Sequence, residues 1–188
     1  MQLKKIGHRN LKTALSVLVC VTINALFEAL LGILPESQSV FYRILYVFIS
    51  RNMLVYACIA AVIVMCGSLS VSYKTGRERT AGTLLGGCAG VAFIFLKHRF
   101  SVPDIFLFPL GVVILIYFLT LIGKEEIVVV TLTVFFITLI NSDEQAHIYV
   151  IAKVMATILG TVISLLVNRY IKPEEISDGK QRKENKKE

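Results

Sequence analysis

Six long apolar stretches without charge limit what this chain can fold into. They cover residues 13–27, 53–73, 80–96, 105–123, 127–142 and 154–168. A helix that crosses a bilayer needs about 20 mostly apolar residues. The first and last stretches reach this length when they are read through Glu28 and Lys153, whereas the fifth is short and bracketed by acidic residues. We therefore predict an all-α integral membrane protein with six transmembrane helices, and five spans is the alternative.

Composition supports this class. Of the 188 residues, 55% are hydrophobic and 18% are charged, whereas a soluble domain carries about 25% charged residues. Residues 1–10 form a basic lead, residues 11–172 a six-helix transmembrane domain, and residues 173–188 a charged tail expected to be disordered. The expected spans are 11–34, 53–72, 80–96, 104–122, 127–141 and 148–171. The apolar segment within 35–52 is too short to cross, so we expect it to lie in the interface or to re-enter.

The basic residues predict the orientation. With six spans, 15 lysines and arginines fall on the side of the two termini and 4 on the other side, with Lys153 set aside as intramembrane. Basic loops stay in the cytoplasm. We therefore expect a multi-pass protein of the cell membrane with both termini cytoplasmic. The net charge of +7 follows from this topology, and a nucleic-acid partner is not expected. The tail lysines are expected to be solvated or to touch anionic membrane lipid.

A short motif occurs twice, in Arg79–Gly86 and again in Lys153–Gly160. Both copies read basic-x-x-small-Thr-x-x-Gly and begin 74 residues apart. Offsets of 0, 3, 4 and 7 lie on one helix face. With six spans the two copies cross the membrane in opposite directions, as in the inverted repeats of transporters. We predict a 3+3 inverted repeat that places the two basic residues near opposite membrane surfaces.

The repeat supplies the candidate substrate pathway. Two inward cations would attract an anion and then release it, so the pathway is predicted to include Arg79, Thr83, Lys153 and Thr157. The alternatives are that Lys153 reaches the membrane surface along its aliphatic stem and that Arg79 only marks the cytoplasmic boundary.

Asn24 and Glu28 extend the candidate pathway along the first span. Together with Ser16 and Cys20 they recur every four residues, a polar stripe that lines a path or holds helices together. A carboxylate within a span costs about 2.5–3.5 kcal/mol on insertion scales, and one interpretation of Glu28 is a role in proton coupling or substrate gating. The alternatives are a position near the headgroups or a pair with Arg51 or Lys153.

Glycines predict close helix packing, with substrate access as the alternative. The positions are Gly82, Gly86, Gly87, Gly90 and Gly160. The chain shows no nucleotide loop, nucleophile elbow or zinc signature. The four cysteines lie in apolar spans and the three histidines in the lead or loops, so neither a metal nor a cofactor is predicted, and no enzyme is expected.

Three segments carry a family resemblance. Residues 6–14, Ile-Gly-His-Arg-Asn-Leu-Lys-Thr-Ala, resemble the N-terminal signature of bacterial aromatic acid exporter family proteins, which belong to the wider fusaric acid resistance (FUSC) group. Residues 68–87 resemble the junction of the second and third helices, and residues 153–173 resemble the last helix. Where the family usually carries arginine and aspartate, this chain has Lys153 and Ala156.

The resemblance implies export of aromatic carboxylic acids or related organic anions by a homodimer. Three hypotheses follow, namely a secondary exporter, a passive anion channel, and a membrane scaffold or partner subunit that does not transport. Many relatives carry a further cytoplasmic helical domain, so the resemblance also leaves room for a separate partner chain.

Overall fold

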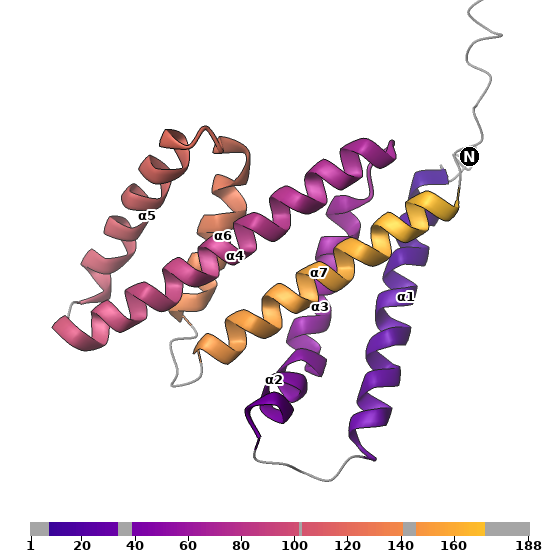
Figure 1. Ribbon diagram of the computed structural model, residues 1–188, viewed down its shortest axis with the longest axis horizontal. Helices are drawn as coiled ribbons and strands as arrows, with labels where there is room; N and C mark the ends of the chain where they lie inside the picture. The colour runs from indigo at the N-terminus through magenta and orange to yellow at the C-terminus, as the bar shows by residue number, and fades with distance from the viewer. Residues whose placement is uncertain (1–7, 34–38, 102, 141–145, 172–188) are drawn as a thin grey trace, which may run out of the picture.

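A computed structural model describes residues 8–33, 39–101, 103–140 and 146–171 (Figure 1). No strand occurs within these ranges. The elements are α1 (His8–Leu31), α2 (Val40–Ile49), α3 (Arg51–Val64), α4 (Leu69–Phe100), α5 (Asp104–Leu121), the 3₁₀ turn η1 (Glu125–Ile127), α6 (Val128–Ile140) and α7 (Ala146–Tyr170). Most of the predicted lead and tail lies outside the described residues.

Four helices are long and apolar enough to cross a membrane, namely α1, α4, α5 and α7. The pair α2 and α3 makes a fifth if it counts as one broken span. Helix α6 has 13 residues and is therefore only about 20 Å long, short of the roughly 30 Å hydrocarbon core. The prediction of an all-helical membrane protein is confirmed with four or five candidate spans.

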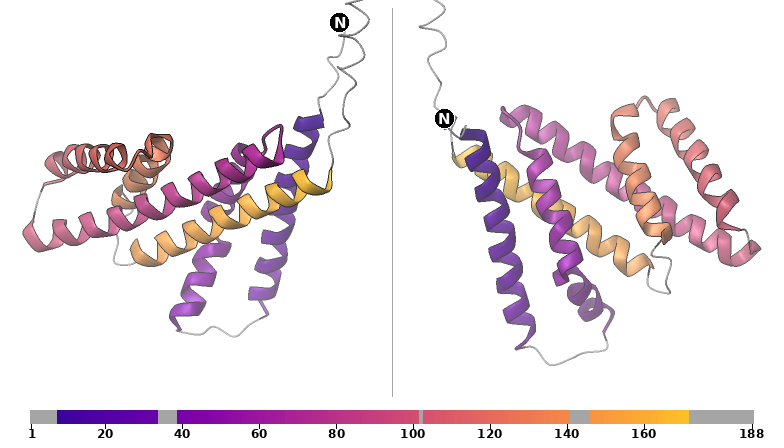
Figure 2. Two further views of the ribbon diagram at one scale, coloured as in Figure 1. Left: turned by 45° about the horizontal axis from the view of Figure 1, so that its top comes forward. Right: turned by 180° about the vertical axis from the view of Figure 1, so that it is seen from behind.

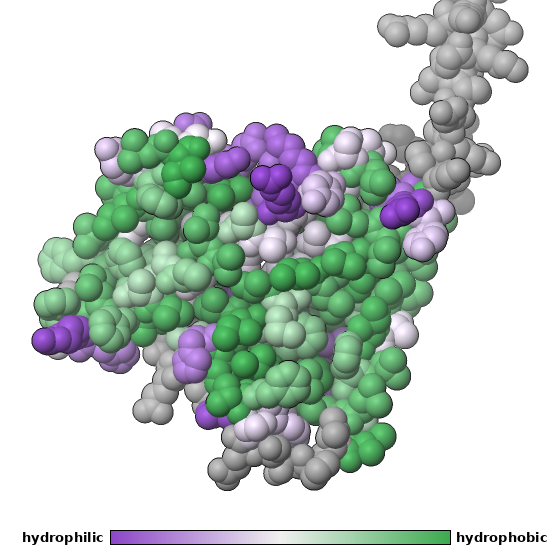
Figure 3. All heavy atoms as spheres, in the orientation of Figure 1, coloured by the Kyte–Doolittle hydropathy of each residue, from purple (hydrophilic) through white to green (hydrophobic). Residues whose placement is uncertain are grey.

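Helices α4 and α7 run side by side in opposite directions through the middle of the molecule (Figures 1 and 2). Helices α1 and α3 lie on one side of this pair, and α5 and α6 on the other. The most extensive packing joins α3 to α7 and α6 to α4. The exposed surface is largely hydrophobic on the face in Figure 3, with hydrophilic residues at its upper and lower margins, as suits a protein surrounded by lipid.

The junction between the second and third predicted spans is placed differently from the expectation. We predicted spans at 53–72 and 80–96 with a charged loop between them, but the chain turns earlier and α4 begins at Leu69. Ser68 caps this helix by accepting a hydrogen bond from the backbone N–H of Val71 at 3.4 Å. Hydropathy falls where charges begin, yet lysine, arginine and glutamate are good helix formers. Lys74 and Arg79 therefore lie within α4 and not in a loop.

The segment expected in the interface forms α2, which is bent by 61° from the helix that follows it. Ser39 caps its start by accepting from the N–H of Tyr42 at 3.2 Å. Phe48 and Ile49 at its end are buried. The segment is thus a short helix whose last turn packs into the protein, and it does not continue straight into α3.

Glycines mark the closest helix contacts. A Cβ atom at Gly86 would overlap the carbonyl oxygen of Thr131 in α6, and one at Gly160 would overlap the carbonyl oxygen of Ala57 in α3. The other predicted packing glycines also face neighbouring side chains, Gly82 against Val130, Gly87 against Val150 and Gly90 against Thr138. The glycine positions thus lie where helix backbones approach one another.

We predict that Gly86→Ala and Gly160→Ala each destabilise the protein. The added methyl group meets main-chain atoms that cannot rotate away, and overpacking of this kind costs about 1–3 kcal/mol. Gly67→Ala is the matched control, because no atom lies within 4 Å of the Cβ position there. Thermal unfolding in detergent measures the effect. Melting temperatures of all three variants equal to the parent would show that these contacts do not hold the helices.

Candidate functional site

Lys153 is buried in the middle of the helix packing. Its side chain is 3% exposed, and its Nζ has no hydrogen-bond partner in the described part of the chain. The Nζ atom lies 4.1 Å from the ring centroid of Tyr56 and 5.7 Å from that of Tyr149. The ammonium group thus faces two aromatic rings, which attract cations through their quadrupoles. Lys153 does not reach the surface as the alternative interpretation required.

The two tyrosines join α3 to α7 above this lysine. Their hydroxyl groups lie 2.9 Å apart and share a hydrogen bond. Tyr149 precedes Lys153 by four residues, so both side chains project from one face of α7. The two tyrosines pack against an apolar cluster that includes Met53, Ala57, Ala152 and Ala156. The cation is therefore held in a dry, aromatic environment, where an unpaired charge is costly.

Arg79 lies in the same central stretch of the α4–α7 contact as Lys153. This stretch is bounded by the hydrogen bond from Asn168 to Ser72 at one end and by the approach of Gly87 to Val150 at the other. Counting residues from each of these two contacts along the antiparallel helices places Arg79 and Lys153 about 8–12 Å apart along the helix axes. Like charges at such a separation repel one another in a low-dielectric interior. Both residues fall within this central stretch, so they lie closer together along the contact than the expectation of opposite membrane surfaces implied.

The two threonines of the repeat are satisfied by their own helices. Thr83 donates a hydrogen bond to the carbonyl oxygen of Arg79 at 2.8 Å, and Thr157 donates to that of Lys153 at 3.0 Å. Both side chains are buried. The two copies of the motif thus share a local hydrogen bond, and each threonine retains an acceptor oxygen but no free proton.

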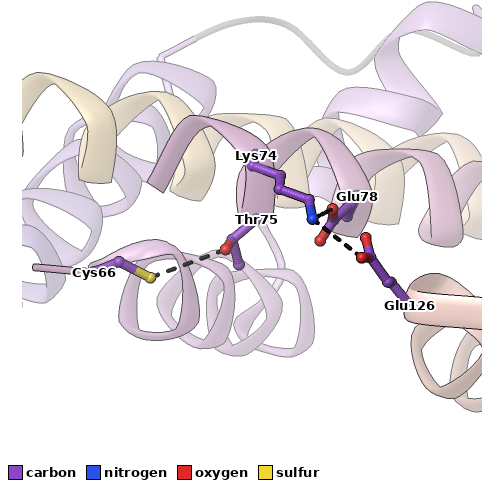
Figure 4. A network of polar contacts seen from close by, with 5 residues as sticks. All are labelled: Cys66, Lys74, Thr75, Glu78 and Glu126. Atoms are coloured by element: carbon purple, nitrogen blue, oxygen red, sulfur yellow. Dashed lines mark hydrogen bonds and ion pairs between the residues drawn. The ribbon is translucent and has the colours of Figure 1, made fainter. Parts of the chain in front are cut away.

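Carboxylates lie away from the two central cations. The ion pairs in the described residues join Lys74 to Glu78 at 3.5 Å, Lys74 to Glu126 at 3.0 Å and Lys97 to Asp104 at 2.7 Å, and Figure 4 shows the first two. Hydrogen bonding with the Glu78 carboxyl and with the ammonium group of Lys74 holds the pKa of the Glu126 carboxyl below its ordinary value. Arg79 and Lys153 take part in none of these pairs, so the centre has positive charge without an acidic partner.

The sequence matches the model of a known protein family. Residues 44–167, from α2 to near the end of α7, match the family described as fusaric acid resistance protein-like. The chain belongs to this family. Neither a curated protein nor a solved structure matches the chain at a significant level.

Family membership and the apolar helices together identify a multi-pass membrane protein. They indicate a transport or resistance role. The family match also covers both copies of the repeated motif, so the central cations belong to the part that this chain shares with its relatives.

Asn24 and Glu28 do not join the central cations. The side-chain amide of Asn24 donates to the carbonyl oxygen of Ile49 at 3.3 Å, which ties α1 to α2. Glu28 is exposed near the end of α1 and makes no ion pair with Lys153. Among the described residues, no hydrogen bond or ion pair joins either of them to Lys153 or Arg79.

A second buried lysine was not recognised from the sequence. The Nζ of Lys12 donates to the Oδ1 of Asn168 at 3.4 Å, and the amide of Asn168 donates to Ser72 Oγ at 3.0 Å and to the Cys66 carbonyl oxygen at 3.3 Å. Ser72 in turn accepts from the N–H of Cys66 at 3.1 Å. This network joins α1, α7 and the turn into α4. Lys12 was counted only as a charge of the N-terminal lead, because its burial follows from tertiary packing.

We predict that Asn168→Ala lowers the free energy of unfolding by about 1–3 kcal/mol, because Lys12 and Ser72 then lose a buried partner. Asn52→Ala, at an exposed position of α3, is the matched control and should change little. Thermal unfolding of the purified proteins makes the comparison. An Asn168→Ala protein that melts with the control would show that the network contributes nothing.

Proposed function

We propose that this protein exports organic anions from the cytoplasm, with aromatic carboxylic acids as the preferred substrates. The observation that carries the proposal is the Lys153 ammonium group, which is buried against Tyr56 and Tyr149 and has no acidic partner among the described residues. Ionisable residues within membrane helices are expensive and usually serve function. Arg79 adds a second positive charge in the same central stretch of the α4–α7 contact.

A carboxylate supplies what this centre lacks. It forms charge-assisted hydrogen bonds with an ammonium group, and it neutralises a cation that otherwise interacts only with ring faces. The ring of an aromatic acid also packs favourably against tyrosine rings, by about 0.5–1.5 kcal/mol beyond the area that it buries. Both parts of such a substrate therefore find a complementary group at Lys153.

We further propose that the chain forms a six-span 3+3 inverted repeat. The first half is α1 to α4 and the second α5 to α7, and the packing of α3 on α7 matches that of α6 on α4. Gly86 and Gly160 hold equal positions in the two motifs, and each meets a backbone carbonyl of the other half. Thr83 and Thr157 make the same local hydrogen bond. These three paired features support the repeat.

We predict that Lys153→Gln and Arg79→Gln lose about tenfold or more of anion flux, because hydrogen bonds to charged groups contribute about 1.5–3 kcal/mol each. Lys153→Arg should retain flux, since it restores the residue usual in the family. Lys97→Gln is the matched control, because it removes one positive charge from the end of α4. Efflux of a panel of aromatic acids from cells and from proteoliposomes measures the effect.

Lys153→Met separates function from stability. It fills the same space without a charge, so this variant should melt at a higher temperature than the parent while losing flux. If the Lys153→Gln protein transports as well as the parent, Lys153 is not part of the substrate pathway. Flux that is independent of an imposed pH gradient would indicate a passive channel, and no flux from the parent protein in liposomes would indicate a scaffold or partner subunit.

We also propose that the protein lies in the cell membrane as a homodimer with both termini in the cytoplasm. The α3–α4 and α5–α6 turns lie along the same edge as the start of α1 and the end of α7 (Figure 1), as an even number of passes requires. The bias of 15 basic residues to 4 favours that edge as the cytoplasmic one.

Single cysteines test this orientation in a protein that lacks the four native cysteines. We predict that Ser101→Cys, between α4 and α5, reacts with an impermeant thiol reagent applied to intact cells. Gly67→Cys and Lys124→Cys, in the two turns at the opposite edge, should react only after the cells are opened. Labelling of Lys124→Cys in intact cells would exclude the six-pass orientation. Cross-linking in the membrane tests the homodimer separately.

A further inference from the structure

A pocket lies between the end of α1 and α2, and it is not part of the Lys153 site. Its volume is about 280 Å³, and its wall includes Glu28 from α1 with Tyr42 and Tyr46 from α2. Pockets for drug-sized ligands measure about 300–1,000 Å³. This pocket is therefore suited to a small ligand or to one headgroup.

The walls of the pocket are held by hydrogen bonds. Tyr42, Tyr46 and Ile49 follow one another at offsets of four and three residues, so they share one face of α2. The Ser39 hydroxyl fixes the start of that helix through Tyr42 N–H. Asn24 fixes its end through the carbonyl oxygen of Ile49. The carboxylate and the two phenol rings are thus presented by packed helices.

The charge of the pocket is opposite to that of the Lys153 site. Glu28 takes part in none of the ion pairs of the described residues, among which the side chain of Arg51 is not included. Arg43 is next to Tyr42 in sequence but does not line the pocket, and its side chain is exposed. A carboxylate beside aromatic rings is the combination that recognises ammonium groups, because ring faces and carboxylates both attract positive charge.

We propose that this pocket binds an alkylammonium group, with Glu28 as its counter-ion and Tyr42 and Tyr46 as its aromatic walls. Two sources have this chemistry, namely the headgroup of an ethanolamine or choline lipid and a free organic amine. The pocket lies at the end of an apolar helix that is long enough to span the membrane, where headgroups gather. This inference does not depend on export of anions.

Tetramethylammonium chloride is the probe, titrated into the full-length protein in detergent, with sodium chloride as the control for ionic strength. The expected result is a melting temperature that rises with tetramethylammonium concentration. Glu28→Gln and Tyr46→Leu should weaken the apparent affinity about tenfold or more, since hydrogen bonds and contacts to charged groups are the stronger ones. Tyr46→Phe keeps the ring and should bind like the parent, as should Glu125→Gln, which removes a carboxylate outside the pocket.

Nanodiscs distinguish the two sources. If a lipid headgroup fills the pocket, the melting temperature should be higher in phosphatidylethanolamine discs than in phosphatidylglycerol discs. The ethanolamine lipid should also suppress the effect of tetramethylammonium. Both effects should require Glu28. If the source is a free amine, tetramethylammonium should stabilise the protein equally in both discs. A tetramethylammonium effect no larger than that of sodium chloride, or one unchanged in both Glu28→Gln and Tyr46→Leu, would overturn the proposal. Tyr46 is 64% exposed, so its replacement tests the pocket even if Glu28→Gln fails to fold.

Discussion

The approach of helix backbones at Gly86 and Gly160 is the contact on which the rest of the structure depends. Lipid tails are as apolar as the helices, so helices in a bilayer associate through close van der Waals packing at small residues. Gly160 sets α7 against α3 at Ala57, and Tyr56 is the preceding residue of α3. Lys153 lies seven residues before Gly160 and hence on the same face of α7. The glycine contact that joins the helices therefore also brings the Lys153 ammonium to the Tyr56 ring.

The two buried lysines differ in their hydrogen-bond partners, and this difference distinguishes a structural lysine from a candidate functional one. Lys12 is 5% exposed and Lys153 is 3% exposed. Lys12 donates to Asn168, whose amide is bonded in turn to Ser72 and Cys66, so this charge is part of a complete network that closes one end of the helix bundle. Lys153 has ring faces only. Buried polar groups are nearly always hydrogen-bonded, and the Lys153 Nζ is one of four buried side-chain atoms of the described residues without such a partner. Under the proposed function, the carboxylate of the substrate supplies that partner.

Hydropathy predicted the apolar helices well and their ends poorly. A helix that spans lipid requires a long run without charge, and such runs are directly visible in the sequence. The start of α4 was misplaced because a helix continues through lysine and arginine as easily as through leucine. Arg79 therefore lies inside a helix that begins at Leu69, along the α4–α7 contact, and not at the start of a helix. The repeat motif, by contrast, identified Gly86 and Gly160, since close packing needs small residues at fixed spacing. Tyr56, Tyr149 and Asn168 were missed because their roles arise from contacts between distant segments, although the spacing of Tyr149 and Lys153 was visible.

Helix α2 links the two proposed sites. The carbonyl oxygen of Ile49 accepts the hydrogen bond from Asn24, beside the pocket that contains Glu28, whereas its side chain belongs to the apolar cluster of Met53 and Ala152 beneath Lys153. The chain bends by 61° at the next residue, so α2 is joined to α3 by a corner and held in place chiefly by these contacts. A cation-attracting pocket and an anion-attracting centre thus share one residue and one short helix. Opposite charges placed in this way favour ligands of opposite sign at each site, and a shift of α2 that loosens one site must alter the packing of the other.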